Sequence, residues 1–173
     1  MKNGATGQPP SSFHLLAGAA FLVVIVAGEA WPTVDTQVLR IPGVILLLAS
    51  TAFWIPPFVL LSRHGSPQPG KGFTHTTRVV RAGLYGVVRH PQYLGYCLMV
   101  AGFVLTGFNA VSGTAGSVAL GAFYLAARSE ERFLVDRSGE DYVRYMSEVP
   151  RFDPVRGTYR KWRAHRHGGN TAS

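Results

Sequence analysis

The sequence predicts an all-α integral membrane protein with about four transmembrane helices, a helical hairpin among them, and amphipathic helices near its C-terminal end. Apolar residues form long uncharged blocks, each close to the roughly 20 residues that a helix needs to cross a bilayer. Cations gather between the blocks and give the 173-residue chain a net charge of +8. Such placement is typical of cytoplasmic loops. We therefore expect a lipid bilayer, and no nucleic acid, as a partner.

The first part of the chain contains two predicted spans. Residues 1–12 are rich in Gly, Pro and Ser and predict a flexible N-terminal tail. Residues 13–62 hold two transmembrane helices, the first ending near Trp31 and the second beginning at Ile41. Pro56-Pro57 lies inside the second span, where we expect a kink or a break because proline removes a helical hydrogen bond.

A basic connector leads to the second part of the chain. Residues 63–90 contain no acidic residue and run into Arg89-His90-Pro91, after which no charge follows until Arg128. The uncharged stretch is too long for one crossing and a little short for two full ones. Asn109, near its middle, predicts a tight turn between two helical arms. Five glycines would let helices pack closely there. They are Gly95, Gly102, Gly113, Gly116 and Gly121.

The chain becomes polar again after Arg128. The helix is expected to continue out of the membrane to Gly139, which breaks it. Residues 140–146 predict a second amphipathic helix, whose acids stand near its N-terminus, as the helix dipole favours. Val149-Pro150 would end this helix. Residues 158–173 predict a basic flexible tail.

The Lys and Arg bias predicts that the N-terminus, the 63–90 connector and the C-terminus all lie in the cytoplasm. A hairpin of two arms returns the chain beside its start, so polar residues far apart in sequence converge on one face. The expected set is Arg89, His90, Tyr93, Arg128, Glu130, Glu131, Tyr142 and Tyr145. We therefore predict a multi-pass protein with a site that faces the cytoplasm.

This set of side chains suits a zwitterionic small molecule. An Arg or His can bind a carboxylate, a Glu can accept from ribose hydroxyls or an ammonium, and a Tyr ring can cover a sulfonium. The alternative is that the arginines only flank the spans and that Glu130-Glu131 is a solvated helix face. No Cys/His group has zinc spacing, so we expect no metal site. No G-x-G-x-x-G motif indicates a Rossmann cofactor site.

Three motifs together resemble a known family. Gly83-x-Tyr85-x-x-x-Arg89-His90-Pro91-x-Tyr93-x-Gly95 is followed by Glu130-Glu131 and then by Gly139-x-x-Tyr142-x-x-Tyr145. This order is similar to the isoprenylcysteine carboxyl methyltransferases and phospholipid methyltransferases, which are integral membrane enzymes that use S-adenosylmethionine. The resemblance makes residues 63–157 the catalytic region, with the hairpin and the C-terminal helices forming the cofactor pocket. It implies that the cofactor is bound by Tyr85, Arg89, His90, Tyr93, Gly95, Glu130, Glu131, Tyr142 and Tyr145, and that Arg128 and Glu131 act in catalysis.

The resemblance implies transfer of a methyl group from S-adenosylmethionine to a lipophilic acceptor, either an isoprenylcysteine-like carboxylate or a lipid amine. A prenylated acceptor and a lipophilic small molecule both fit, and the oligomeric state is left open. One alternative is an intramembrane NADPH-dependent reductase of the sterol or steroid type. Those enzymes usually read Pro-Asn-Tyr-x-Gly-Glu, whereas this chain has Tyr96 after Gly95. The other alternative is a non-enzymatic four-span scaffold.

Overall fold

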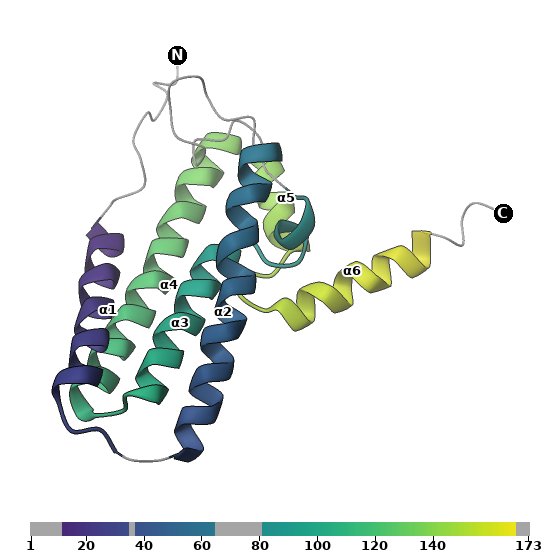
Figure 1. Ribbon diagram of the computed structural model, residues 1–173. Helices are drawn as coiled ribbons and strands as arrows, with labels where there is room; N and C mark the ends of the chain where they lie inside the picture. Colours follow the sequence, from purple (N-terminus) through teal and green to yellow (C-terminus); the bar gives the residue numbers. More distant parts are fainter. Residues whose placement is uncertain (1–11, 35–36, 65–80, 169–173) are drawn as a thin grey trace. The chain divides into compact units, whose positions relative to one another are not determined.

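The structure is a computed structural model that describes residues 12–34, 37–64 and 81–168 (Figure 1). The predicted N-terminal tail, apart from Ser12, and most of the 63–90 connector lie outside the described residues. All regular elements of the described part are helical. They are α1 (Ser12–Ala30), α2 (Gln37–His64), the 3₁₀ helix η1 (Gly83–Gly86), α3 (Pro91–Thr106), α4 (Ala110–Ser138), α5 (Glu140–Glu148) and α6 (Pro154–Gly168). The predicted all-α class is confirmed.

The chain divides into two compact units. Unit 1 comprises Met1–Trp54 and Gln92–Arg137, and unit 2 comprises Ile55–Pro91 and Ser138–Ser173. Within α2, the boundary between the units falls between Trp54 and Ile55, one residue before Pro56-Pro57. The helix runs through both prolines without interruption, so the break that the sequence allowed does not occur.

In the described part of the chain, three helices are long and apolar enough to cross a membrane: α1, the first 18 residues of α2, and α4. The fourth predicted crossing, α3, is apolar but has only 16 residues, about 24 Å of helix. Large apolar side chains on α1 and α2 face outward, with Leu15 71% exposed and Leu48 68% exposed. Such surfaces are expected to contact lipid tails rather than water. The membrane character of the prediction is confirmed, whereas the count of four spans is not.

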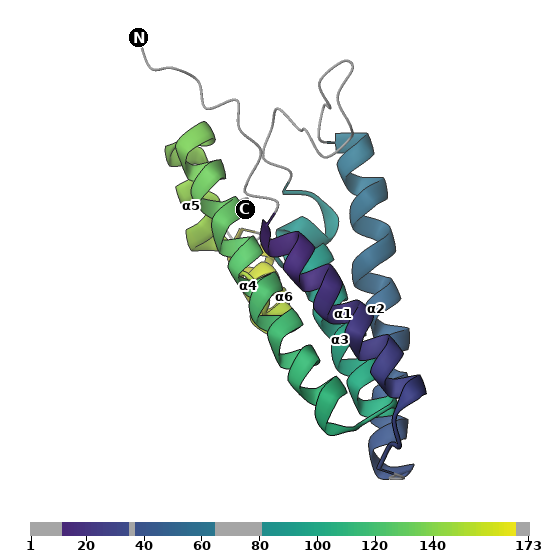
Figure 2. The same ribbon diagram turned by 90° about the vertical axis from the view of Figure 1, so that its left-hand side faces the viewer.

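In unit 1, α3 packs closely against α2 at two glycines (Figures 1 and 2). A Cβ atom built on Gly102 would lie 2.9 Å from the carbonyl oxygen of Gly43, and one on Gly95 would lie 3.1 Å from the backbone nitrogen of Trp54. A larger residue would push the helices apart, because backbone atoms cannot rotate away. These contacts confirm the prediction of close packing for Gly95 and Gly102.

The three other predicted glycines, all on α4, differ in how closely another residue approaches them. At Gly116, an added Cβ would lie 2.5 Å from Val104 Cγ2, so α4 approaches α3 at this point. The nearest neighbour at Gly113 is the Phe108 ring at an ordinary 3.4 Å, and nothing lies within 4 Å of a Cβ at Gly121. The prediction is therefore wrong for Gly121, which faces open space rather than another helix. Spacing alone does not tell which face of α4 meets its neighbour.

The hairpin turn between α3 and α4 forms at Asn109, as predicted. Asn109 Oδ1 accepts a 2.9 Å hydrogen bond from the Ser112 N–H, and Ser112 Oγ accepts a 3.0 Å bond from the Asn109 N–H. This reciprocal pair satisfies two backbone donors at the start of α4, in the manner of a capping box. Asn109 Nδ2 also donates 2.9 Å to the carbonyl of Ala27, near the end of α1. The turn thus joins α1 to the α3–α4 hairpin.

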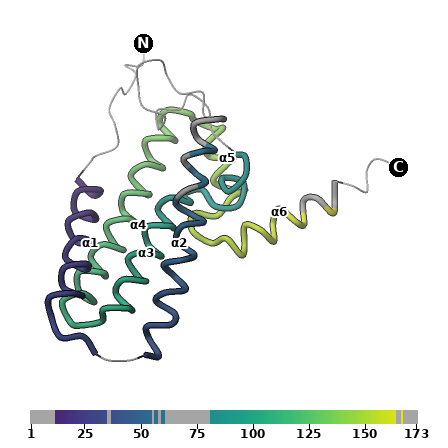
Figure 3. The backbone as a smooth tube through the Cα atoms, viewed as in Figure 1, coloured from purple at the N-terminus to yellow at the C-terminus, as the bar shows by residue number. Residues whose placement is uncertain are grey.

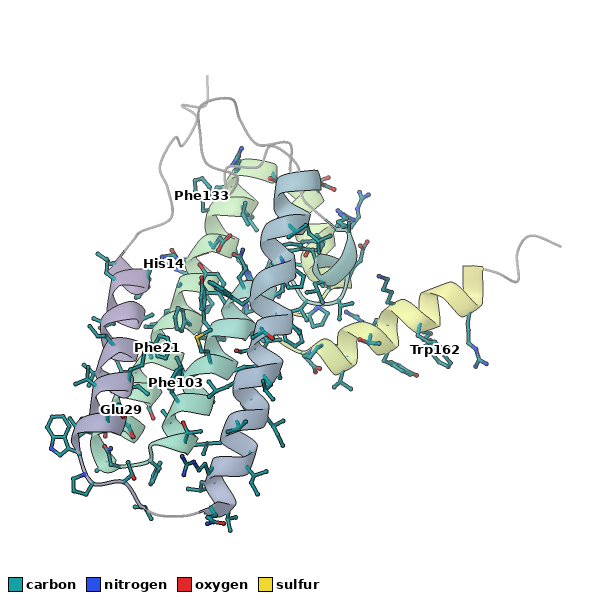
Figure 4. All side chains as sticks on the ribbon, viewed as in Figure 1. His14, Phe21, Glu29, Phe103, Phe133 and Trp162 are labelled. Carbon is teal, nitrogen blue, oxygen red and sulfur yellow. The ribbon has the colours of Figure 1, made fainter. Side chains whose placement is uncertain are left out.

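Above the turn, α1 packs against α3 through aromatic rings. Phe21 and Phe103 meet edge to face, with ring centroids 5.7 Å apart (Figure 4). Such pairs contribute about 0.5–1.5 kcal/mol beyond the burial of their area. The helix α4 continues as a single element for 29 residues, about 44 Å, and ends before Gly139, which has a φ of 59° (Figure 3). The predicted break at Gly139 is confirmed.

In unit 2, α5 and α6 follow Gly139. The predicted amphipathic helix over 140–146 is α5, which ends at Glu148. The last helix, α6, begins at Pro154, and Asp153 Oδ1 accepts a 2.8 Å bond from the Arg156 N–H as its cap. The prediction of a flexible tail is therefore wrong for residues 158–168, which are helical, because it overlooked the cap and the N-terminal proline. Residues 169–173 lie outside the described part.

Candidate functional site

The predicted site residues divide equally between the two units. Unit 1 holds Tyr93, Gly95, Arg128, Glu130 and Glu131, and unit 2 holds Tyr85, Arg89, His90, Tyr142 and Tyr145.

The unit 1 group centres on Tyr93 in the first turn of α3. Its side chain is buried, with 8% exposed, and its ring lies 6.2 Å from that of Phe123 on α4. The Tyr93 hydroxyl interacts electrostatically with the Glu130 carboxylate. The hairpin therefore brings Tyr93 of the Arg-His-Pro-x-Tyr motif to Glu130 of the Glu-Glu motif. This convergence is what the sequence predicted.

A third residue, His14 of α1, completes the cluster. His14 Nε2 and the Tyr93 hydroxyl lie 2.5 Å apart, and the two rings are 5.7 Å apart (Figure 4 labels His14). Which of these two groups donates depends on the tautomer of the imidazole. Polar contacts thus run from His14 through Tyr93 to Glu130, across three helices.

The remaining unit 1 residues occupy different environments. Glu131 is 3% exposed, which is unusual for a carboxylate and costly unless it is compensated. Arg128, one turn earlier on α4, is exposed. Gly95 is buried against α2, where its small size is needed for packing. Its cofactor role stays a prediction, and the contact with α2 is sufficient to explain a glycine at this position.

Gln92, which precedes Tyr93, has a buried side-chain amide nitrogen. This Nε2 atom has no hydrogen-bond partner among the described residues. A buried amide donor without a partner costs about 1–3 kcal/mol, so such atoms call for an explanation in a native structure. A ligand oxygen would satisfy it. The first turn of α3 thus carries the Gln92 amide donor and the Tyr93 hydroxyl, and the latter interacts with the Glu130 carboxylate of α4.

In unit 2, the Arg89-His90 segment runs beside the chain that follows α5. The Arg89 N–H donates 2.9 Å to the Pro150 carbonyl, and the His90 N–H donates 3.4 Å to that of Arg151. Arg89 Nη1 also donates 3.3 Å to the carbonyl of Met146. His90 is buried and its ring lies 6.1 Å from the Phe152 ring. The predicted convergence of the Arg-His-Pro segment with the C-terminal region is present, and backbone hydrogen bonds hold it.

Two tyrosines of α5 face the same part of unit 2. Tyr142 and Tyr145 are each 3% exposed, and their rings lie 5.7 Å apart. The Tyr145 hydroxyl donates a 2.6 Å bond to the carbonyl of Tyr85 in η1. Arg81 lies over the Tyr145 ring at 5.6 Å and forms ion pairs with Asp141 at 2.7 Å and Glu148 at 3.2 Å. Tyr145 thus holds η1 to α5.

Burial raises the pKa of the Tyr145 phenol well above its usual range, and the neighbouring Tyr142 and Tyr85 raise it further, while Arg89 and Arg81 oppose the change. The phenol therefore stays neutral in the folded protein at any ordinary pH, and its bond to the Tyr85 carbonyl persists.

Sequence reasoning missed two residues. His14 is a lone histidine at the start of an apolar span, and Gln92 occupies the variable position of Arg-His-Pro-x-Tyr. Only the position of Gln92 next to the motif could have drawn attention to it. As for metals, the described residues contain no group of three His, Cys, Asp or Glu side chains that could hold an ion.

The fold and these clusters define a class of protein: a helical membrane protein with polar residues at the ends of its spans. Comparison with known families assigns it further. The family model described as phospholipid methyltransferase matches residues 38–140, more than half of the chain. The chain belongs to this family. The match includes all of the unit 1 group and excludes His14, Tyr142 and Tyr145.

Curated relatives are protein-S-isoprenylcysteine O-methyltransferases. The protein of Schizosaccharomyces pombe is 31% identical over 97 residues, which cover 51% of this chain and 41% of that protein. Protein-S-isoprenylcysteine O-methyltransferase B of Arabidopsis thaliana is 30% identical over 90 residues, which cover 47% of this chain and 46% of that protein. The human protein is 31% identical over 84 residues, covering 48% and 29%. The chain thus matches less than half the length of each of these relatives. A search of solved structures finds no match.

Proposed function

We propose that this protein is an integral membrane methyltransferase that moves a methyl group from S-adenosylmethionine to a lipophilic acceptor. The observation that carries the proposal is the contact of Tyr93 with Glu130 in a chain of the phospholipid methyltransferase family. These two residues come from separate motifs, and the hairpin unites them at the start of α3. A scaffold would have no need for a partly buried carboxylate paired with a buried phenol at this position.

The residues present fit the proposed cofactor. When bound, S-adenosylmethionine supplies an electrophilic methyl group on a sulfonium. Glu130 would accept hydrogen bonds from ribose hydroxyls or the amino group, and the unpartnered Gln92 amide would donate to a ligand oxygen. Within unit 2, Arg89 is a cation of the kind that binds a carboxylate, and His90 and Tyr142 carry rings of the kind that stack on a base. Tyr85 and Tyr145 fix η1 and α5 in that unit, and Gly95 fixes α3 in unit 1.

The reaction itself requires positioning more than strong acid or base chemistry, because methyl transfer from a sulfonium is an in-line displacement. A carboxylate acceptor is already anionic and needs no base. The exposed Arg128 would orient it by a charged hydrogen bond. An amine acceptor would have to lose a proton, which Glu131 or His90 would take. Because Arg128 is a cation suited to a carboxylate, we favour a prenylcysteine-like acid over a lipid amine.

The proposed acceptor is lipophilic because its site lies at the ends of membrane spans. The relatives named as isoprenylcysteine methyltransferases favour a prenylated acceptor. The excess of Lys and Arg in residues 63–90 and in the C-terminal segment favours a site that faces the cytoplasm.

Thermal unfolding of the detergent-solubilised full chain tests the class of cofactor. We expect S-adenosylhomocysteine to raise the unfolding temperature and NADPH to leave it unchanged, since a ligand that binds only the folded state stabilises it. Stabilisation by NADPH alone would indicate a reductase, and stabilisation by neither would indicate a non-enzymatic protein. Transfer of labelled methyl to a farnesylated cysteine with a free carboxyl, compared with phosphatidylethanolamine, then identifies the acceptor class.

A further inference from the structure

The last helix, α6, has an apolar face that no described residue covers. Val155, Tyr159 and Trp162 are 79%, 57% and 50% exposed, respectively. At about 100° of rotation per residue, positions spaced by four and then three fall on one stripe of the helix. The stripe forms an open apolar surface together with Pro154 and Thr158. A stripe of this kind in water costs free energy, so it indicates contact with another apolar medium.

The opposite face of α6 is already occupied within unit 2. Gly157 is buried, and a Cβ built on it would overlap the carbonyl oxygen of Val87. Arg160 Nη1 donates 2.9 Å and 3.2 Å to the carbonyls of Ser147 and Glu148 at the end of α5. The face of α6 that carries Gly157 and Arg160 therefore holds the helix within unit 2, and the apolar stripe lies on the opposite face.

Cations border the stripe. Arg156 and Arg163 lie about 100° and 80° around the helix from Val155, and Lys161 lies about 120° around on the other side. All three are exposed. Arg166 falls within the stripe, where its guanidinium lies 4.5 Å from the Trp162 ring and so shields the indole with a charge. The sequence Pro154–Gly168 contains no Asp or Glu.

An apolar stripe with Trp and Tyr, bordered by Lys and Arg, is the pattern of a helix that lies in the plane of a membrane surface. Tyr and Trp prefer the headgroup level, where the ring is apolar and its N–H or O–H remains wet. The cations then meet anionic headgroups. The described part of the same chain carries three helices able to span a bilayer, so α6 is tethered to a membrane.

We propose that α6 is an interfacial helix that docks its Val155–Tyr159–Trp162 stripe on the bilayer and binds anionic lipid headgroups through Arg156 and Arg163. This lipid-binding surface is separate from the residues proposed for methyl transfer. Its test uses no enzymatic readout, so the two proposals stand or fall independently.

The test places the full chain in lipid nanodiscs, one molecule per disc, with Trp31→Phe and Trp54→Phe so that Trp162 is the sole tryptophan. In discs with about one third phosphatidylglycerol, Trp162 emission should shift to the blue and be quenched by brominated acyl chains. Phosphatidylcholine discs should show less of both effects. Raising NaCl from about 0.1 M to about 1 M shortens the Debye length from about 10 Å to about 3 Å and should reduce the lipid difference.

Matched variants separate docking from overall charge. The double variant Arg156→Gln, Arg163→Gln should lower the equilibrium constant for docking of α6 on the bilayer about 30-fold, since each interfacial cation contributes about fivefold to it. The control, Arg137→Gln with Arg144→Gln, removes the same charge outside α6 and should leave Trp162 emission unchanged. Equal effects of both pairs would overturn the proposal.

Other occupants of the stripe give different outcomes, each of which overturns the proposal. A water-exposed, unquenched Trp162 in anionic discs would assign the stripe to a soluble partner. Protection that appears only in liposomes at high protein density, independent of lipid charge, would assign it to a second copy of this chain. A nitroxide at Val155→Cys in a Cys97→Ser background provides an independent measurement in case the tryptophan variants do not fold. Docking predicts that oxygen reaches this label better than a polar nickel reagent does.

Discussion

Tyr93 in unit 1 and Tyr145 in unit 2 are both buried, yet the protein holds them in different ways. Tyr93 is held by side chains: it interacts with His14 and Glu130 and packs against Phe123. Tyr145 instead donates to a backbone carbonyl, that of Tyr85, in a unit where backbone bonds also join Arg89 to Pro150. Side-chain partners can be rearranged by a ligand, whereas backbone partners fix the path of the chain. The comparison indicates that the contacts of Tyr93 can adjust to a ligand, whereas the contact of Tyr145 fixes the path of the chain within unit 2.

The largest expected effect concerns the helix packing on which the Tyr93 cluster depends. Gly95→Val should destabilise the protein by about 3 kcal/mol or more, because the added atoms meet the backbone of Phe53 and Trp54, which cannot move aside. Thermal unfolding in detergent measures this loss. Gly121→Val is the matched control, since nothing lies within 4 Å of its new Cβ. Similar losses from both variants would show that β-branching, and not close packing, is responsible.

The next effect tests whether the unit 1 cluster binds the cofactor. Glu130→Gln should raise the Kd of S-adenosylmethionine about 10- to 100-fold, because a hydrogen bond to a charged group contributes about 1.5–3 kcal/mol. Isothermal titration calorimetry gives this value directly. Glu140→Gln, which neutralises an exposed carboxylate at the start of α5, should bind like the wild type. Unchanged affinity in Glu130→Gln would remove this residue from the site.

In unit 2, loss of the hydrogen bond from Tyr145 to Tyr85 should lower the free energy of unfolding rather than the affinity for S-adenosylmethionine. Tyr145→Phe leaves the Tyr85 carbonyl without its 2.6 Å donor and should cost about 1–3 kcal/mol of unfolding free energy. Tyr159→Phe, at an exposed phenol of α6, should cost far less. A variant that unfolds normally but binds S-adenosylmethionine weakly would reverse the assignment, making Tyr145 a ligand residue.

The same residue predicts a response to alkaline pH. Burial raises the pKa of Tyr145 in the folded state, while the unfolded chain loses the phenol proton above about pH 10. The unfolded state then binds fewer protons than the folded state, so the stability due to Tyr145 is complete below about pH 10 and falls as pH rises further. Between about pH 9 and about pH 11, the free energy of unfolding should fall less with rising pH in Tyr145→Phe than in the wild type.

The smallest expected effect is at His14, which we interpret as a positioning residue for Tyr93. His14→Leu should raise the KM for S-adenosylmethionine about 2- to 10-fold, the equivalent of one hydrogen bond, with little change in kcat. His14→Gln keeps a hydrogen-bonding group of similar reach and should recover most of the loss. If His14→Gln and His14→Leu behave alike, the contact with Tyr93 is only packing.

The sequence predicted the parts of this molecule that depend on strong local signals. The uncharged stretch before Arg128, with Asn109 at its middle, required a hairpin, and the hairpin alone implies that Tyr93 meets Glu130. His14 could not be predicted in the same way. Its partner lies on a helix distant in sequence, and a lone histidine in an apolar span does not indicate which face of its helix it occupies.

The helix α6 was missed for a different reason. Its cations made residues 158–173 resemble a disordered tail, and they hid Tyr159 and Trp162, which continue a helical spacing from Val155. The Asp153 cap and Pro154 were visible as a start signal, but a helix whose apolar face has no protein partner is not specified by core packing.

The unbroken length of α4 has one more consequence. Ala110–Ala127, its uncharged part, is about 27 Å long, and Glu130 and Glu131 follow on the same rigid helix with no hinge between. A bilayer thicker or thinner than this stretch must be accommodated by tilting the whole helix or by deforming the lipid around it. Any such tilt carries the two carboxylates with it and changes their height relative to the headgroups. Acyl-chain length is therefore a variable that should enter any measurement of this protein in membranes.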